Sequence, residues 1–196
     1  MYYIFYAIIL TFSLSSCGQS WTPPGPTMST IVTILDTAER PIWYGFSGSH
    51  AIITAGHVAT PCRISICRSR DSTGKIASIP YDTISLPEDT DIAYIGPLWV
   101  DEHALPMDIS VWDTLTVFVS RDGEWQRIDG YAVSLDASYV GYDSSLSGKV
   151  FTGAIETDIL VEKWESGAPV WDSDGELVGV MSAVDRGRGR GYIVRP

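Results

Sequence analysis

The sequence has little positive charge and few cysteines, and each shortage excludes a class of function. Its 196 residues carry 13 Lys and Arg against 24 Asp and Glu, a formal net charge of −11. Binding of nucleic acid requires a basic face that neutralises phosphates, and electrostatic binding of anionic lipid requires clustered cations. Neither kind of binding is therefore expected. The 3 cysteines lack the spacing of a zinc site. We therefore expect no nucleic-acid partner, no metal and no cofactor.

Charged residues are also scarce, at 19% of the chain, whereas apolar residues reach 45%. This composition excludes general disorder and suffices for one domain, or for two small ones that share a core. Short β-branched and aromatic runs alternate with turn residues, without the strand–helix–strand rhythm of a parallel sheet, which predicts an all-β fold. The expected strands are Ile31–Leu35, Ile42–Phe46, Ala51–Thr54, Arg63–Cys67, Ile92–Ile95, Leu115–Ser120, Gln126–Val133, Val150–Ile155, Pro169–Trp171, Leu177–Ala183 and Gly191–Val194.

The N-terminus indicates export. Tyr2–Leu14 is almost entirely apolar and is too short to span a bilayer comfortably, but it suits the apolar region of a signal peptide. The following Ser-Ser-Cys resembles the lipobox of bacterial lipoproteins, although the usual Lys or Arg near the start is missing. We expect residues 1–17 to be a signal peptide with a lipobox, Cys17 to be lipidated, and residues 18–28 to be a flexible tether. The expected location is the cell envelope, as a membrane-anchored lipoprotein; an uncleaved apolar anchor and plain secretion are the alternatives.

Three short stretches carry side chains that can together activate a nucleophile. An apolar strand ends at His57 in the stretch AIITAGHVA, and Asp91 leads into a buried strand in DTDIAYI. The third stretch, WESGAPV, places Ser166 before a glycine. A serine hydroxyl is a weak nucleophile until a histidine accepts its proton and a buried carboxylate orients that histidine. Each stretch alone is ordinary, but together they have the chain order His, Asp, Ser that distinguishes one class of hydrolase from others.

These stretches resemble the chymotrypsin-like serine proteases. TAGH resembles the family's Thr-Ala-Ala-His, DIAY resembles its Asp-Ile-Ala-Leu, and ESGAPV resembles its Asp-Ser-Gly-Gly-Pro-Val. The nearest likeness is to the HtrA/Deg-type bacterial protease domain, because Ile155–Asp158 (IETD) resembles an Ile-Gln-Thr-Asp at the same distance before the serine. The end of the chain, Gly189–Pro196, resembles the last strand of that domain. The resemblance covers about residues 29–196, and we expect no PDZ module.

The resemblance implies a double six-stranded antiparallel β-barrel, with residues 29–106 and 107–196 as the two barrels of one protease domain. It implies a serine endopeptidase that hydrolyses peptide bonds of a polypeptide through an acyl-enzyme, with His57, Asp91 and Ser166 as the catalytic triad. The backbone N–H groups of Trp164 and Ser166 would form the oxyanion hole. The substrate-binding residues would be Leu160, Val161, Met181, Ser182, Ala183 and Val184.

Departures from the family pattern leave alternatives open. Trp164 stands where the family usually has Gly, and a bulky residue there costs roughly 1–2 kcal/mol if the loop needs a backbone conformation natural to Gly. One alternative is therefore a weak or inactive protease-like binding lipoprotein with a disturbed oxyanion loop, and another is an esterase that uses the same triad. Asp89 competes with Asp91 for the third triad position, because both carboxylates share a face of an extended segment. Leu160 and Val161 indicate a preference for apolar or small substrate side chains.

Overall fold

The computed structural model describes residues 31–35, 38, 41–47, 51–60, 67–70, 76–79, 84–87, 90–96, 108–141 and 148–196. The signal peptide, Cys17 and the tether therefore lie outside the described residues, as do Asp89 and the expected barrel boundary near residue 106. Within the described ranges, no helix is long and apolar enough to cross a membrane.

The first half of the chain forms a seven-stranded antiparallel sheet in the order β5-β4-β1-β2-β3-β7-β6. Alternation of β-branched and aromatic residues with turns gives short strands, most of them packed on a core around Ile34, Val58 and Ile95. A single helical turn, α1 (Gly56–Ala59), follows β3 directly. The strands are β1 (Ile31–Leu35), β2 (Pro41–Ser47), β3 (Ile52–Ala55), β4 (Cys67–Arg70), β5 (Ile76–Ile79), β6 (Ile84–Ser85) and β7 (Ile92–Ile95).

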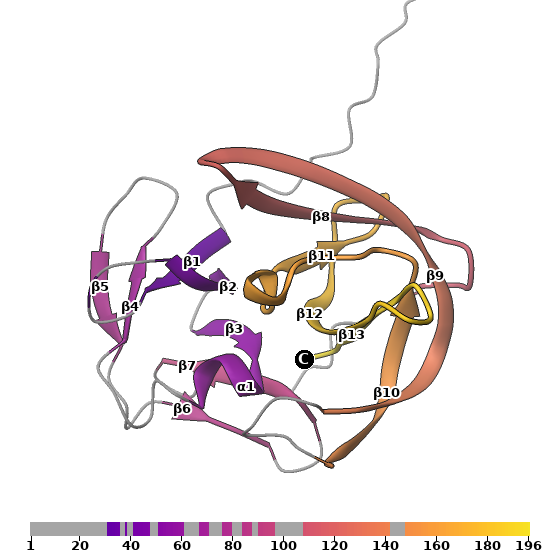
Figure 1. Ribbon diagram of the computed structural model, residues 1–196, viewed down its shortest axis with the longest axis horizontal. Coiled ribbons are helices and arrows are strands. Elements are labelled where there is room, and N and C mark those ends of the chain that lie inside the picture. The colour runs from indigo at the N-terminus through magenta and orange to yellow at the C-terminus, as the bar shows by residue number, and fades with distance from the viewer. Residues whose placement is uncertain are drawn as a thin grey trace, which may run out of the picture.

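The second half closes into a six-stranded barrel in the order β10-β13-β12-β11-β8-β9. Alternate residues of the strands fill its interior, as Leu115, Val117 and Val119 of β8 do, each fully buried. Strand β9 is long enough to curve around the barrel, pairing first with β8 and then with β10 (Figure 1). The strands are β8 (Thr114–Arg121), β9 (Glu124–Val140), β10 (Val150–Thr157), β11 (Pro169–Trp171), β12 (Leu177–Asp185) and β13 (Arg190–Val194), with a 3₁₀ turn, η4 (Lys163–Glu165), between β10 and β11.

The all-β class with two antiparallel sheets is confirmed, with differences in detail. The first sheet has seven strands over the described residues, where the expected barrel has six, and only the second sheet is closed. The strand expected at Arg63–Cys67 is described at Cys67–Arg70 instead, and residues 61–66 lie outside the described residues. Strand β9 is longer than expected because it bends from one partner strand to the next.

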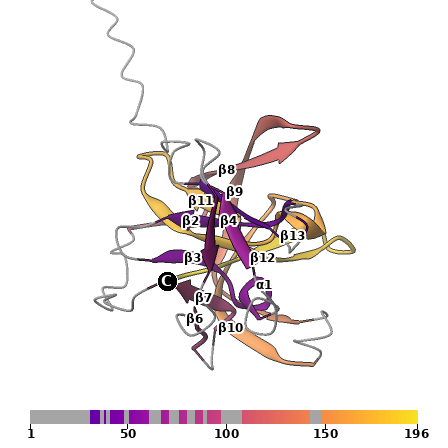
Figure 2. The same cartoon turned by 90° about the vertical axis from the view of Figure 1, so that its left-hand side faces the viewer.

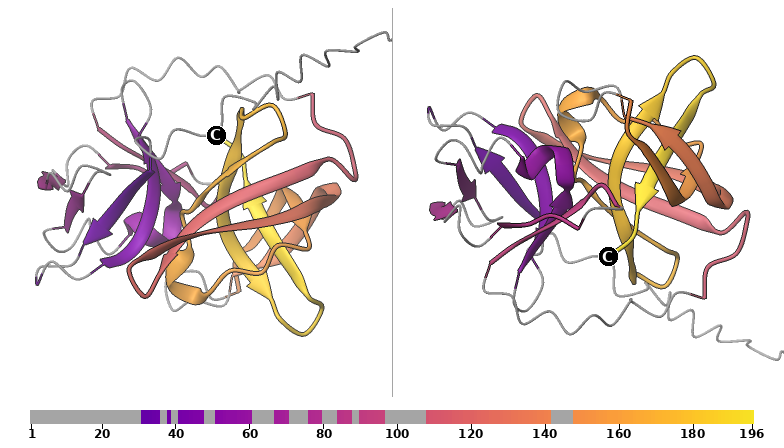
Figure 3. Two further views of the ribbon diagram at one scale, coloured as in Figure 1. Left: turned by 90° about the horizontal axis from the view of Figure 1, so that it is seen from above. Right: turned by 90° about the horizontal axis from the view of Figure 1, so that it is seen from below.

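The two halves lie side by side in Figure 3 and one behind the other in Figure 2, and backbone hydrogen bonds join them at a seam. Tyr44 of β2 donates its backbone N–H to the Ser166 carbonyl at 3.1 Å, and its hydroxyl bonds to the backbone of Ser120 in β8. Gly167 has φ +84°, and a Cβ at this position would lie 2.0 Å from the Tyr44 carbonyl oxygen. Only glycine fits here, so the seam fixes the position of the backbone on either side of Ser166.

Candidate active site

Strand pairing brings His57 and Asp91 together. The pairing of Ala55 with Ile92 sets the end of β3 beside the start of β7, and Gly56 N–H donates to the Asp91 carbonyl at 2.9 Å. The His57 backbone N–H then donates to Asp91 Oδ1 at 2.8 Å, and the ring nitrogen Nδ1 lies 2.7 Å from Asp91 Oδ2. Asp91 is 1% exposed. An ionised carboxylate only accepts hydrogen bonds, so Nδ1 carries the proton and Nε2 is left as the proton acceptor.

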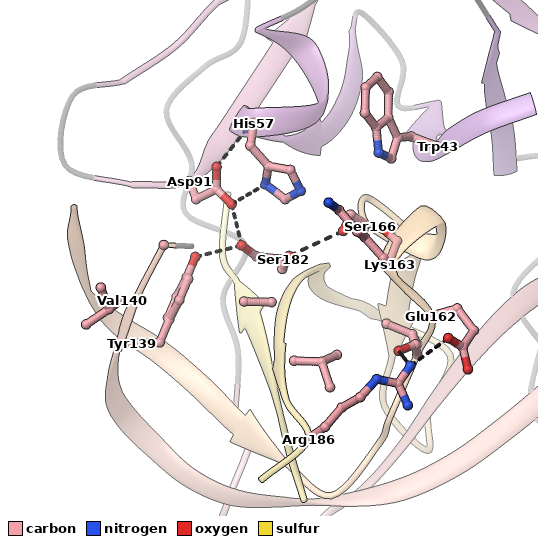
Figure 4. Close-up of a pocket in the computed structure, with 14 residues that line it drawn as sticks. Trp43, His57, Asp91, Tyr139, Val140, Glu162, Lys163, Ser166, Ser182 and Arg186 are labelled. Carbon is pink, nitrogen blue, oxygen red and sulfur yellow. Dashed lines mark hydrogen bonds and ion pairs between the residues drawn. The ribbon is translucent and has the colours of Figure 1, made fainter. Parts of the chain in front are cut away.

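Two hydroxyl groups complete the surroundings of the Asp91 carboxylate. Ser182 Oγ of β12 donates a hydrogen bond to Asp91 Oδ2. The hydroxyl of Tyr139, from β9, lies 2.6 Å from Ser182 Oγ. Asp91, Ser182 and Tyr139 are all buried, so these bonds are formed away from water, where they are strongest (Figure 4).

Ser166 lies in the same pocket as His57 and Asp91. The pocket has a volume of about 460 Å³ and is formed at the seam between the two halves (Figure 4). The Ser166 hydroxyl, however, lies 3.2 Å from the Lys163 carbonyl oxygen and 3.4 Å from that of Ser182. No hydrogen bond joins this hydroxyl to the His57 ring in the part of the chain that the structure describes. The structure thus brings the three candidate residues together, with the hydroxyl turned toward main-chain acceptors.

The oxyanion hole expected at Trp164 and Ser166 is not formed in this conformation. Residues Lys163–Glu165 make a 3₁₀ turn, and the Lys163 carbonyl oxygen accepts from the Ser166 hydroxyl. The C=O of Lys163 and the N–H of Trp164 belong to one planar trans peptide and point in opposite directions, so the Trp164 N–H points away from the Ser166 hydroxyl. The Trp164 side chain is 58% exposed.

A buried ion pair anchors this turn. Glu165, directly before Ser166, is fully buried, and Arg121 at the end of β8 donates to its two carboxylate oxygens at 2.7 and 2.8 Å. The Glu162 N–H also donates to Glu165 Oε2, at 2.6 Å. The hydrogen bond to Glu165 raises the pKa of Arg121, which keeps its charge. Arg121 carries no local sequence signal, because it meets its partner only through the closure of the barrel.

The structure brings four of the six expected substrate-binding residues to the pocket: Val161, Ser182, Ala183 and Val184. Leu160 is outside the pocket lining, and its side chain is 38% exposed. Met181 is fully buried, and its backbone N–H and carbonyl bond to Ala168 and Gly167. The Met181 main-chain groups are therefore engaged within the molecule, and a contact between Met181 and substrate stays a prediction.

The remaining pocket lining was not foreseen from the sequence. Trp43 of β2 and the end of β9, with Tyr139, form two of its walls. Another wall carries charge, since Arg186 Nη2 donates to Glu162 Oε2 at 2.6 Å. Among the described residues, no cluster of three His, Cys, Asp or Glu side chains could hold a metal ion. The arrangement offers a buried carboxylate, an oriented imidazole and an adjacent hydroxyl, which together are suited to moving a proton.

Comparisons with known proteins give structural matches alone. No model of a protein family and no curated protein matches the sequence. The MamO protease domain from Magnetospirillum magneticum, in its apo form, superposes with a TM-score of 0.61 and 17% identity, over 87% of this chain and 93% of that one. The active form of the Rv3671c protease from M. tuberculosis gives a TM-score of 0.66 and 15% identity, over 86% and 77%.

Deg5 gives a TM-score of 0.59 and 22% identity, over 86% of this chain and 84% of that one. At such low identities the matches establish the fold and not the activity. The chain therefore has the chymotrypsin-like serine protease fold seen in HtrA/Deg-type protease domains.

Proposed function

We propose that the chain is a serine endopeptidase of the cell envelope that hydrolyses peptide bonds through an acyl-enzyme. The observation that carries the proposal is the His57–Asp91 pair, in which a 2.7 Å hydrogen bond to a buried carboxylate leaves Nε2 ready to accept a proton. This geometry has a cost in desolvation free energy, because an ionised carboxylate is held away from water. General-base catalysis accounts for it, since the imidazole gains a positive charge when it takes the proton of a hydroxyl.

The reaction would begin with attack of Ser166 Oγ on the substrate carbonyl carbon while His57 Nε2 takes the hydroxyl proton. The carbonyl π electrons move to oxygen, which becomes the oxyanion of a tetrahedral intermediate. Collapse of that intermediate breaks the C–N bond, and His57 returns the proton to the leaving amine. Water then attacks the ester by the same route, which releases the acid and restores the serine.

Two local movements must precede attack. The Ser166 hydroxyl has to rotate from the Lys163 and Ser182 carbonyls toward His57, and the Lys163–Trp164 peptide has to turn so that its N–H faces the oxyanion. A substrate strand supplies a reason for both, because strand addition beside Ser182–Val184 would compete for the Ser182 carbonyl. On the described residues, this part of β12 pairs with β13 on one side, and β11 pairs with β12 only at Leu177–Val180. The apolar side chains of Val161 and Val184 favour small or apolar substrate residues at the pocket.

A fluorophosphonate probe, which reacts with activated serines, tests the proposal. We expect the folded protein to be labelled at Ser166 and to cleave casein, and we expect Ser166→Ala to lose both properties. His57→Ala should also lose labelling while keeping the same thermal unfolding midpoint. Labelling that persists in Ser166→Ala, or that is independent of His57, would refute the proposed mechanism.

A second candidate, a protease-like binding lipoprotein, is favoured by one observation. The Lys163 carbonyl oxygen faces the Ser166 hydroxyl and so presents an acceptor where the oxyanion would need donors. If this conformation persists with a peptide bound, the site would hold a polypeptide without cleaving it. Failure of the probe to label folded protein, both alone and with casein present, would support binding without hydrolysis.

A further inference from the structure

Tyr139 is fixed in place at the edge of the pocket. Its ring is stacked between those of Phe151 and Tyr192, with centroids 5.2 and 5.0 Å away and interplanar angles of 25° and 22°. The residue is 6% exposed, so its hydroxyl has lost most of its access to water. A buried hydroxyl requires a protein partner, and a ring held on both faces delivers that hydroxyl to one point in space.

That point is the Ser182 hydroxyl, and the direction of the hydrogen bonds follows from the chemistry of Asp91. An ionised carboxylate cannot donate a hydrogen bond, so Ser182 Oγ donates its single proton to Asp91 Oδ2. The bond of 2.6 Å between Tyr139 and Ser182 must then be donated by the phenol. The same Asp91 oxygen accepts from His57 Nδ1 at 2.7 Å. The four groups form one chain, Tyr139 to Ser182 to Asp91, with His57 on the far side (Figure 4).

We propose that Tyr139 is a positioning residue for the candidate catalytic pair, acting through Ser182 to hold the Asp91 carboxylate and so set the pH dependence of the site. This inference rests on the proposed function. Hydrogen bonds in series strengthen one another in a dry environment, so the phenol increases the donor strength of the Ser182 hydroxyl. Burial, together with the charge of Asp91, raises the pKa of Tyr139, so the phenol keeps its proton throughout the range in which a histidine titrates.

Removal of the phenol hydroxyl should have a definite direction of effect. In Tyr139→Phe, Ser182 Oγ loses its donor, and the Asp91 carboxylate is less strongly hydrogen-bonded and attracts a proton on His57 more strongly. The acidic limb of the kcat/KM profile should then move to higher pH by a few tenths of a unit, and kcat should fall about 3- to 10-fold with KM unchanged. The other ionisable side chains of the pocket, Glu162, Lys163 and Arg186, are the same in every variant.

Tyr192→Phe is the matched control. Tyr192 is 4% exposed and stacks on Tyr139, but its hydroxyl interacts with Arg188 and not with the Asp91 chain. A purely structural effect of losing a tyrosine hydroxyl should appear in both variants as a similar change in unfolding midpoint. We expect only Tyr139→Phe to shift the pH profile. Equal shifts in the two variants, or none in either, would overturn the inference.

A double-mutant cycle tests whether Tyr139 acts through Ser182. In a Ser182→Ala background, adding Tyr139→Phe should change kcat by less than about 2-fold and should move the acidic limb of the pH profile by less than about 0.1 unit. The hydrogen-bond chain from Tyr139 to Asp91 is already broken in that background. Full additivity of the two substitutions would show that the phenol acts by another route and would contradict the proposal.

A readout that needs no turnover separates this inference from the proposed function. The Nδ1 proton of His57, hydrogen-bonded to Asp91, should give a downfield NMR resonance even if the wild-type protein cleaves nothing. We expect Tyr139→Phe to shift that resonance and to raise the pH at which it changes, whereas Tyr192→Phe should leave both unchanged. Identical spectra for wild type and Tyr139→Phe would refute the positioning role, whatever the activity proves to be.

Discussion

The two sides of the candidate active site differ in how completely they are organised. On one side, His57 and Asp91 are joined at 2.7 and 2.8 Å, and the carboxylate accepts a further hydroxyl. On the other side, the Ser166 hydroxyl lies 3.2 Å or more from main-chain acceptors, and the Lys163 carbonyl faces it. The proposed base is therefore arranged in advance of substrate, whereas the proposed nucleophile and oxyanion loop are not.

The difference follows from the elements that hold each side. His57 and Asp91 stand at the ends of two paired strands, β3 and β7, and the ladder between them fixes their spacing. Ser166 follows a 3₁₀ turn of three residues, held mainly by the Glu165 carboxylate. Sheet ladders are stiffer than isolated turns, so the loop is the side on which substrate or sequence change can act.

Asp91→Asn should give the largest effect, by disabling the organised side. The His57 backbone N–H holds the amide oxygen at the Oδ1 position, so the NH2 group faces Nδ1 and donates to it. The imidazole then loses its required tautomer and the stabilisation of its charged form. We expect kcat/KM for a peptide substrate to fall on the order of 10⁴-fold, with the unfolding midpoint little changed. Glu156→Gln, which alters a partly buried carboxylate that pairs with Arg190 outside the pocket lining, should retain full activity. A loss below 10-fold in Asp91→Asn would remove this residue from the triad.

Arg121→Met should give the second-largest effect, a loss of stability on the side of the site that holds Ser166. It leaves the fully buried Glu165 carboxylate without its cation, at a cost of about 3–5 kcal/mol in the free energy of unfolding. The double variant Arg121→Met with Glu165→Gln should recover part of that loss, because no buried charge is left. Urea denaturation measures both values. Equal destabilisation by the single and double variants would show that the ion pair does not anchor the loop.

Trp164→Gly should make the loop before Ser166 better able to adopt the arrangement needed for an oxyanion hole. Glycine adopts backbone conformations that cost a bulky residue roughly 1–2 kcal/mol, so the Lys163–Trp164 peptide would turn more easily toward the oxyanion. We expect fluorophosphonate labelling of Ser166 to accelerate about 5- to 30-fold. Trp164→Ala is the control, since it removes the indole but keeps the Cβ, and it should gain little. A gain of the same size in both variants would point to the indole itself.

Alkaline pH should have the smallest effect, a loss of stability that arises from Tyr139 on the His57–Asp91 side of the site. Burial and the charge of Asp91 raise the pKa of Tyr139, while the hydrogen bond to Ser182 lowers it, with a net increase. The folded form keeps the phenol proton, whereas the unfolded chain loses it near pH 10. The stabilising contribution of Tyr139 to the free energy of unfolding is therefore fully present below that pH and declines above it. Between pH 9 and 11, wild type should lose about 1 kcal/mol more stability than Tyr139→Phe, measured by urea denaturation at each pH. Parallel curves for the two proteins would contradict this assignment.

The sequence was sufficient where the evidence is local. His57 at a strand end, Asp91 before a buried strand and Ser166 before Gly167 each stand in a stretch that can be interpreted alone, and the short β-branched runs predicted most of the strands. The structure places Asp91 on His57, and Asp89 lies outside the described residues.

Sequence reasoning could not find what depends on closure of the fold. Tyr139 meets Ser182 across 43 positions, and Arg121 meets Glu165 across 44. Neither belongs to a motif, and each contact arises from strand register in the barrel. The orientation of the Lys163–Trp164 peptide is also invisible to a motif, because both orientations use the same residues. β6 has only two residues, too few to show an alternating pattern.

Gly167 carries a consequence for how such a protein would lose function. Its α-carbon rests against the Tyr44 carbonyl of the opposite sheet, with no room for one methyl group, and Ser166 is bonded across the same seam at 3.1 Å. A slight parting of the two halves would displace the serine from the histidine while every strand remained intact. Inactivation by heat or by a wedge-shaped small molecule would then come before melting, and loss of turnover would be the first sign of damage.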